Sequence, residues 1–342
     1  MKNSKMFVFV LLALAFVTFL PPDAFPQGKP VELRLAHMFP IGSPSHQVID
    51  AWAKKIAADS KGRLTIRIFP VNTLIPAPEI YDGVAKGTAD IGFSFRYLPK
   101  SYGLGVTFPF ILGAPDVVTA DRVYDEIWKK FPKVMGEEWK EVKVLWLSSS
   151  MIQAISTRKP VRTLEDMKGL QMRVPSRELG DLMKDLGSAP AFMSTADFVI
   201  AIEKGTVDGA VIQPGAIDDN KLGRKIKFVL DLSLGAPTPV NAIMNKDSFN
   251  QLPADLQSVI DNSCGFGKEG TLKIWVDAFD NAMKYFKAEG VEYVHLSPEE
   301  RARWTPLIDR ARDRVGADLD TKGYPGTEIV RFIRERIGHY AK

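Results

Sequence analysis

Cysteine is almost absent from this chain. Among 342 residues there is only Cys264, so no intramolecular disulfide can form. This excludes the class of small extracellular domains whose fold depends on several disulfides. Cys264 lies in the middle of a predicted helix among apolar residues, and this position favours a packed thiol over a catalytic nucleophile.

Long apolar runs are also scarce. The single one, MFVFVLLALAFVTFL at residues 6–20, follows Lys2 and Lys5 and ends at a proline pair. A basic start and a short apolar run are typical of a secretory signal peptide, and the run is short for a membrane span. We predict a signal peptide over residues 1–27 and, since disulfides are absent, a mature protein in the bacterial periplasm. An uncleaved anchor stays open, because the cleavage site matches the usual small-residue pattern poorly.

Catalytic and nucleotide-binding motifs are missing. The sequence has no phosphate-binding loop, dinucleotide-binding glycine pattern, serine-hydrolase elbow or zinc-protease motif. Its four histidines lack the spacing of metal ligands, and its net charge of +4 comes from scattered basic residues, which argues against nucleic acid as a partner. We therefore expect a binding protein that uses no cofactor and no metal. An exported enzyme remains an alternative, because an active site can be assembled from distant residues.

What is present is a regular alternation of strand and helix patterns. Strands are predicted at residues 31–36, 63–69 and 89–95, and helices after Ser43 and at residues 78–86. Such alternation predicts an α/β fold with a mainly parallel sheet flanked by helices. The length of 342 residues favours two domains over one.

Two segments far apart in the sequence look alike. VAKGTADIG (84–92) and IEKGTVDGA (202–210) both end a predicted helix with Lys-Gly-Thr and begin a strand near an aspartate. The glycine suits a left-handed helix cap, and the lysine complements the carboxyl end of the helix. We interpret the pair as a sign of two related lobes; convergent capping chemistry is the alternative. Asp208 in the second segment is expected to stabilise the turn.

A long helical pattern covers residues 253–289. Gly265, Gly267 and Gly270 interrupt it, and each glycine costs a regular helix up to about 1 kcal/mol relative to alanine. We expect one long helix that bends at these glycines and runs behind both lobes, or two ordinary helices separated by a kink. A strand at 291–297 and helices near 298–315 and 327–337 follow.

The segment DMKGLQMRVPSRE (166–178) combines a strand, a turn and a helix start. Alternating apolar residues predict a short strand up to Pro175, and Ser176 is the expected N-cap of the next helix. Arg173 therefore lies at the carboxyl end of a strand, where open α/β sheets bind ligands. The alternative is an arginine that faces solvent or pairs with a neighbouring acid. His37 also directly follows a predicted strand, and either a ligand contact or a structural role fits it.

These segments resemble a known family, the DctP-type extracytoplasmic solute receptors of tripartite ATP-independent periplasmic (TRAP) transporters. The resemblance covers the whole mature chain. It rests on three ordered blocks: LRLAHMFPIGSPSH with GVAKGTADIGF, TLEDMKGLQMRVP with AIEKGTVDGAVIQP, and NKDSFNQLPADLQSVI.

The resemblance implies a two-lobed periplasmic binding protein (type II-like). Its ligand cleft lies between the lobes, and a long helix towards the C-terminus bridges them. We place lobe I at residues 31–152 with about 241–280, and lobe II at 153–240 with about 281–342. Such a receptor closes by a hinge motion and delivers its ligand to a small and a large membrane subunit driven by an ion gradient. A receptor for a sensory or scavenging system would share this fold.

The resemblance also assigns residues. The family's signature arginine matches Arg173, which is expected to pair with the carboxylate of a small organic acid. Some members, notably sialic-acid receptors, carry a further arginine where Gln153 lies here, so a simpler carboxylate is expected. The remaining candidate ligand contacts lie at or near strand ends: Phe93, Arg96, Tyr97, Trp146, Gln213 and Asn241. For the aromatic residues among them, packing in the core is the alternative.

Overall fold

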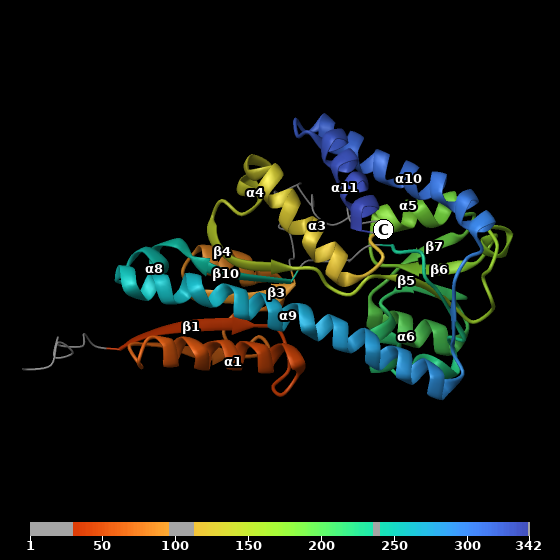
Figure 1. Cartoon of the computed structure of the whole chain (residues 1–342). Helices are drawn as coiled ribbons and strands as arrows, with labels where there is room; N and C mark the ends of the chain where they lie inside the picture. Colours follow the sequence, from red (N-terminus) through yellow and green to blue (C-terminus); the bar gives the residue numbers. More distant parts are fainter. Residues whose placement is uncertain (1–29, 96–112, 235–239, 341–342) are drawn as a thin grey trace, which may run out of the picture.

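The computed structural model describes residues 30–95, 113–234 and 240–340. Two β-sheets with helices packed on them form two lobes, and helix α9 runs along both (Figure 1). The first sheet has the order β2 (Leu64–Phe69), β1 (Val31–His37), β3 (Ile91–Phe95), β10 (Val240–Asn245) and β4 (Val142–Ser148). The second has the order β11 (Glu292–Val294), β9 (Phe228–Leu230), β5 (Ala154–Thr157), β8 (Gly209–Ile212), β6 (Gln171–Val174) and β7 (Ala189–Phe192). This confirms the predicted α/β fold of two lobes.

Helices follow most strands. They are α1 (Pro44–Asp59), α2 (Ile80–Ala85), α3 (Val117–Lys130), α4 (Pro132–Glu138), α5 (Arg177–Asp185), α6 (Thr195–Lys204), α7 (Pro214–Asp219), α8 (Lys246–Asn250), α9 (Ala254–Glu289), α10 (Pro298–Thr321) and α11 (Gly326–Tyr340). The predicted N-cap at Ser176 is confirmed, and Ser43 caps α1 in the same way: each hydroxyl accepts the backbone N–H three residues further on. Each such cap stabilises its helix by about 1 kcal/mol.

The two lobes repeat one structural unit. The chain order is β1, α1, β2, α2, β3 in the first and β6, α5, β7, α6, β8 in the second, and in both the first strand lies between the other two, parallel to each. The Lys-Gly-Thr segments precede the third strand, with φ of 77° at Gly87 and 74° at Gly205. Asp90 and Asp208 then each accept a backbone N–H from the first strand of their unit. The similarity in the sequence therefore reflects a structural repeat, and Asp208 has the expected structural role.

Two crossovers join the sheets at the carboxyl ends of their parallel strands. β4 is antiparallel to β10 and therefore parallel to β1 and β3; it ends at Ser148, and five crossover residues separate it from the start of β5 at Ala154. β5 is antiparallel to β8, so its first residue lies at the carboxyl edge of the second sheet. β9, antiparallel to β5, ends at the same edge before the chain enters β10. The carboxyl edges of the two sheets consequently face each other.

Helix α9 is continuous over 36 residues, so the alternative of two helices is wrong. It contacts α1, α3 and β4 of the first lobe and α7 and β11 of the second, as Figure 1 shows. Two of its glycines allow close packing: a Cβ at Gly267 would meet the ring of Trp146 at 2.5 Å, and one at Gly270 would meet Val48 at 3.1 Å. The glycines serve these contacts rather than a break in the helix.

The C-terminal helices contact both lobes. Trp304 of α10 packs in the core of the second lobe, whereas Leu319 of the same helix and Ile333 of α11 pack with the core around α3. The lobe boundaries that we placed in residues 241–342 therefore stay a prediction. Within the described ranges, no helix has the length and apolarity that a membrane span requires.

Candidate functional site

Arg173 lies in β6 with its side chain turned into the second lobe. The residue is 6% exposed, and its guanidinium makes three hydrogen bonds. Nε donates to the carbonyl oxygen of Met193 at 3.0 Å, Nη1 donates to that of Val211 at 3.0 Å, and Nη2 donates to Oγ1 of Thr195 at 3.4 Å. All three acceptors are neutral.

The buried charge of Arg173 has no counter-ion among the residues that the structure describes. Burial lowers the pKa of the guanidinium. Among the described residues, no carboxylate opposes this shift. A buried charge without a partner costs several kcal/mol. A guanidinium has five N–H donors, and three are engaged here, which leaves one on Nη1 and one on Nη2. This pair of donors matches the two oxygens of a carboxylate.

Thr195, which the sequence analysis missed, adds to this environment. It is the first residue of α6, whose N-cap is Ser194. Because the positive end of the helix dipole lies at this terminus, the surroundings of Arg173 favour an anion. The Ser-Thr-Ala-Asp sequence after β7 is a capping pattern, and this pattern could have identified Thr195 as a residue at a helix N-terminus.

Gln213 lies at the same edge of the second sheet. It directly follows β8, and its Nε2 donates to the carbonyl oxygen of Met151 at 3.1 Å and to Oγ of Ser150 at 3.4 Å. Arg173 donates a hydrogen bond to the carbonyl oxygen of Val211, which lies in β8 two residues before Gln213. The structure therefore brings Arg173 and Gln213 to the carboxyl edge of the second sheet, beside the first crossover.

His37 lies at the facing edge of the first sheet, at the end of β1. Its Nδ1 accepts the backbone N–H of Phe39 at 3.1 Å, so its Nε2 carries the proton that is shared with Nδ1 of His46 at 3.0 Å. Burial, with a smaller contribution from His46, lowers the pKa of His37 to about 4. His37 is therefore a neutral hydrogen-bonding group at neutral pH.

Asn241 belongs to the same edge. It lies in β10 opposite Ser94 of β3, one residue beyond the Phe93 that pairs with His37. The side chain is buried, and its Oδ1 has no hydrogen-bond partner among the described residues. Because an unpaired buried acceptor costs about 1–3 kcal/mol, a donor from a ligand would be favourable here.

The aromatic residues that were predicted to contact the ligand are either buried in the core or outside the described residues. Phe93 and Trp146 are buried in the core of the first lobe, where the Trp146 indole N–H donates to Thr271 of α9 at 3.0 Å. Both rings therefore fit the alternative of core packing, and their contact with a ligand stays a prediction. Arg96 and Tyr97 lie outside the described residues.

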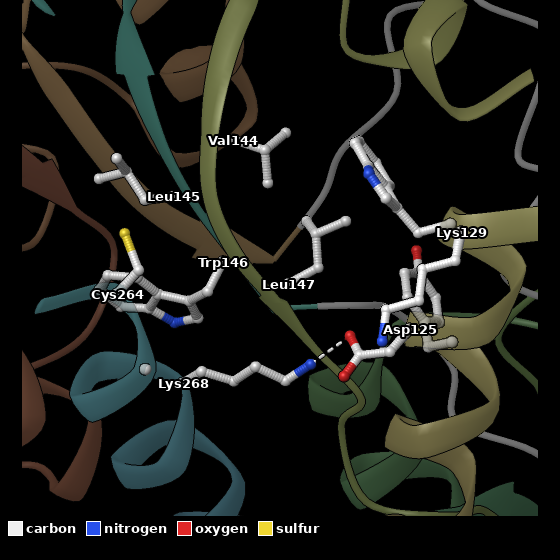
Figure 2. A pocket seen from close by; sticks show the side chains of 11 residues that line it. Asp125, Lys129, Val144, Leu145, Trp146, Leu147, Cys264 and Lys268 are labelled. Atoms are coloured by element: carbon white, nitrogen blue, oxygen red, sulfur yellow. Dashed lines mark hydrogen bonds and ion pairs between the residues drawn. The ribbon is translucent and has the colours of Figure 1, made fainter. Parts of the chain in front are cut away.

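Trp146 also borders a surface cavity of about 370 Å³ between α3, β4 and α9. Figure 2 shows Cys264 beside the indole and the ion pair between Lys268 and Asp125 at the opposite wall. Neither Arg173 nor Gln213 lines this cavity, so it is separate from the candidate ligand site.

Gln153 lies in the first crossover and is 3% exposed. Its backbone carbonyl oxygen accepts the N–H of Leu234, whereas its side-chain Oε1 has no partner among the described residues. It lines a cavity next to α9. No hydrogen bond within the described residues joins its side chain to Arg173.

The amino-acid sequence matches a known family. The family model named DctP, bacterial extracellular solute-binding protein, family 7, covers residues 35–316. The chain belongs to the DctP family. This membership shows that the chain is an extracellular solute-binding protein, as the sequence analysis predicted.

Individual relatives agree with this membership. A solute-binding protein of Albidiferax ferrireducens is 28% identical over 326 residues, which are 89% of this chain and 91% of that protein. The monocarboxylate 2-oxoacid-binding periplasmic protein of a Nostoc species is 26% identical over 222 residues, 60% of this chain and 58% of that protein.

A solved structure shows the same fold. It is a TRAP periplasmic solute-binding protein from Desulfovibrio salexigens in an open form, with the C-terminus of a symmetry mate in its ligand-binding site. The match has a TM-score of 0.79 at 23% identity and covers 91% of this chain and 96% of that chain.

Proposed function

We propose that this DctP-family receptor binds a small organic acid whose carboxylate pairs with Arg173. The observation that carries the proposal is the buried guanidinium: its three acceptors are neutral, and one N–H on each terminal nitrogen has no partner among the described residues. A carboxylate would accept both and neutralise the charge. Hydrogen bonds that involve a charged group contribute about 1.5–3 kcal/mol each.

Ligand binding and lobe closure are coupled in this proposal. Arg173 and Gln213 belong to the second lobe, and His37 and Asn241 lie at the facing edge of the first. A ligand held by both edges favours the closed state, because only that state permits both sets of contacts. Among the described residues, 149–153 and 231–234 belong to the segments that such a motion would bend.

The acid that fits best is a monocarboxylate. Arg173 is the one residue of the four at the facing edges that carries a positive charge, and Gln153 is neutral where sialic-acid receptors have a second arginine. His37 and Asn241 offer uncharged hydrogen-bonding groups to the rest of the ligand. The Nostoc relative, named for binding monocarboxylate 2-oxoacids, supports this class.

The partners that we propose are the small and large membrane subunits of a TRAP transporter, to which the closed receptor delivers its ligand. This part rests on family membership. Uptake of a labelled acid into vesicles that contain both subunits, driven by a sodium gradient and dependent on added receptor, tests it. Uptake that proceeds equally without receptor would contradict it.

The ligand itself can be identified directly. Native mass spectrometry of protein purified without denaturation is expected to reveal a bound acid, and calorimetry with a panel of monocarboxylates and 2-oxo acids then ranks candidates. The best ligand is expected to be recovered chemically unchanged after prolonged incubation. Turnover of that ligand would instead support an exported enzyme.

A further inference from the structure

Two histidines of the first lobe form a hydrogen-bonded pair at the edge that faces the second lobe. His37 ends β1 at the carboxyl edge of the first sheet, and His46 lies in the first turn of α1. Nε2 of His37 and Nδ1 of His46 are 3.0 Å apart, and the ring centroids are 5.1 Å apart. The sequence analysis considered only His37 as a ligand contact.

The backbone of Phe39 fixes the protons of both rings. Because the Phe39 N–H donates to Nδ1 of His37, this nitrogen carries no proton, and the neutral ring carries its proton on Nε2. Nε2 of His37 therefore donates to Nδ1 of His46. His46 accepts at Nδ1, so its own proton lies on Nε2. Both nitrogens of His37 are thus used within the protein, and the outermost donor of the chain is the Nε2–H of His46.

His46 is the ring of this pair that a solute can reach. It is half-buried, whereas His37 is 1% exposed. Among the described residues, Nε2 of His46 has no hydrogen-bond partner. Side chains in a helix lean towards its N-terminus, and the N-terminus of α1 follows the carboxyl end of β1. The ring of His46 therefore lies at the edge that faces the second lobe.

The His46 donor is held in place before any ligand binds. Its backbone N–H donates to Oγ of the N-cap Ser43 at 3.3 Å, and its ring is held by His37. The positive end of the helix dipole of α1 lies at the same terminus. A fixed N–H in this position favours an oxygen acceptor and loses little conformational entropy on binding.

We propose that His46 is a further ligand-binding residue of the receptor and that His37 is the positioning residue behind it. The inference rests on the function proposed above: Arg173 holds the carboxylate from the second lobe, and the Nε2–H of His46 donates to another oxygen of the same acid from the first. The hydrogen-bonding group of His37 thus reaches the ligand through His46. The favoured acid carries an acceptor oxygen beside its carboxylate, because an acid without one leaves the His46 donor unpaired.

Two amide variants of His46 test this role. Asparagine places its amide near the position of Nδ1, where it can accept from His37 but does not reach the ligand. Glutamine places its amide near the position of Nε2, where it can donate to the ligand. Calorimetry with pyruvate, lactate, phenylpyruvate and mandelate measures the affinities. For the tightest of these acids, we expect His46→Asn to weaken binding by about fivefold and His46→Gln by less than about twofold.

The oxygen itself is tested with matched acids. Wild type is expected to prefer pyruvate over propanoate and phenylpyruvate over 3-phenylpropanoate, which lack the oxo oxygen, and His46→Asn is expected to lose this preference. A weaker affinity in His46→Gln than in His46→Asn, equal affinities in both, or an unchanged preference in His46→Asn would each overturn the role of His46. Failure of wild type to bind any of the four oxygenated acids would overturn the acid class.

A double-mutant cycle tests the positioning role of His37. His37→Leu is expected to weaken binding by about threefold in wild type and to have no further effect in the His46→Asn background, because the donor that it positions is already gone. Additive losses would show a merely structural role.

Arg173→Ala separates this inference from the proposed function. If that variant still binds the acid as wild type does, and His46→Asn weakens binding, the carboxylate pairing with Arg173 fails while the His46 donor stands. If Arg173→Ala abolishes binding and His46→Asn leaves it unchanged, the proposed function stands and the role of His46 fails.

Discussion

The carboxylate of Asp121 in α3 accepts a hydrogen bond from the backbone N–H of Ser149 at 2.9 Å. Asp121 is buried, and its other oxygen lies 3.2 Å from Nζ of Lys268 in α9. A single buried carboxylate thus joins α3, the first crossover and the long helix, which are the elements around one end of the proposed hinge.

We predict that Asp121→Ala lowers the free energy of unfolding by about 1–3 kcal/mol, because it leaves the Ser149 N–H without an acceptor in a buried place. Lys268 keeps its second partner, Asp125, so it does not become an isolated charge. Urea denaturation measures the change. The control is Asp125→Ala, at a half-exposed position, for which we expect less than about 1 kcal/mol. Equal losses in the two variants would contradict the role of Asp121.

The glycines of α9 give a second matched pair. A Cβ at Gly267 would meet the Trp146 ring at 2.5 Å, whereas nothing lies within 4 Å of a Cβ at Gly265. We predict that Gly267→Ala destabilises the protein by about 1–3 kcal/mol through overpacking. Gly265→Ala should instead stabilise it by up to about 1 kcal/mol, because alanine is the better helix former. Thermal unfolding measures both, and a stabilising Gly267→Ala would contradict the packing described here.

His37 makes stability depend on pH. Its pKa is about 4 in the folded protein and 6.5 in the unfolded chain, so the unfolded chain binds more protons between these values. Stability therefore rises with pH across this window and is lost as pH falls through it, by at most about 1.4 kcal/mol per pH unit from this residue. His46, half-buried beside it, is the titratable group that contributes to the shift.

The prediction is that His37→Asn flattens the dependence of unfolding free energy on pH between about 6.5 and 4. Denaturant titrations at several pH values measure the slope. The wild-type protein, measured in the same titrations, is the reference. An unchanged slope in His37→Asn would show that the neutral, buried histidine is not the source.

The repeat was accessible from the sequence because it depends on local patterns. Lys-Gly-Thr requires a left-handed glycine at a helix end, and both glycines adopt it. Ser176 and the alternation before it likewise placed Arg173 on a short strand. The pattern indicated only a position where open α/β sheets bind ligands; the expected pairing with a carboxylate came from the resemblance.

Other features depend on contacts between segments that are distant in the sequence, so local sequence patterns could not predict them. The glycines of α9 look like helix breakers, but Trp146 and Val48 require them. Phe93 and Trp146 occupy strands that reach the carboxyl edge, and only the folded structure shows that both rings pack in the hydrophobic core of the first lobe. Thr195 meets Arg173 across 22 positions of sequence.

The most direct measurement is the affinity of Arg173→Ala for the best-binding organic acid, compared with Arg177→Ala. Arg177 lies four residues away with its side chain 88% exposed, so it controls for a change of net charge. Loss of two charge-assisted hydrogen bonds is expected to weaken binding by at least about a hundredfold in Arg173→Ala, with less than about a twofold change in Arg177→Ala. Comparable affinities of wild type and Arg173→Ala, with both variants folded, would contradict a carboxylate held by Arg173.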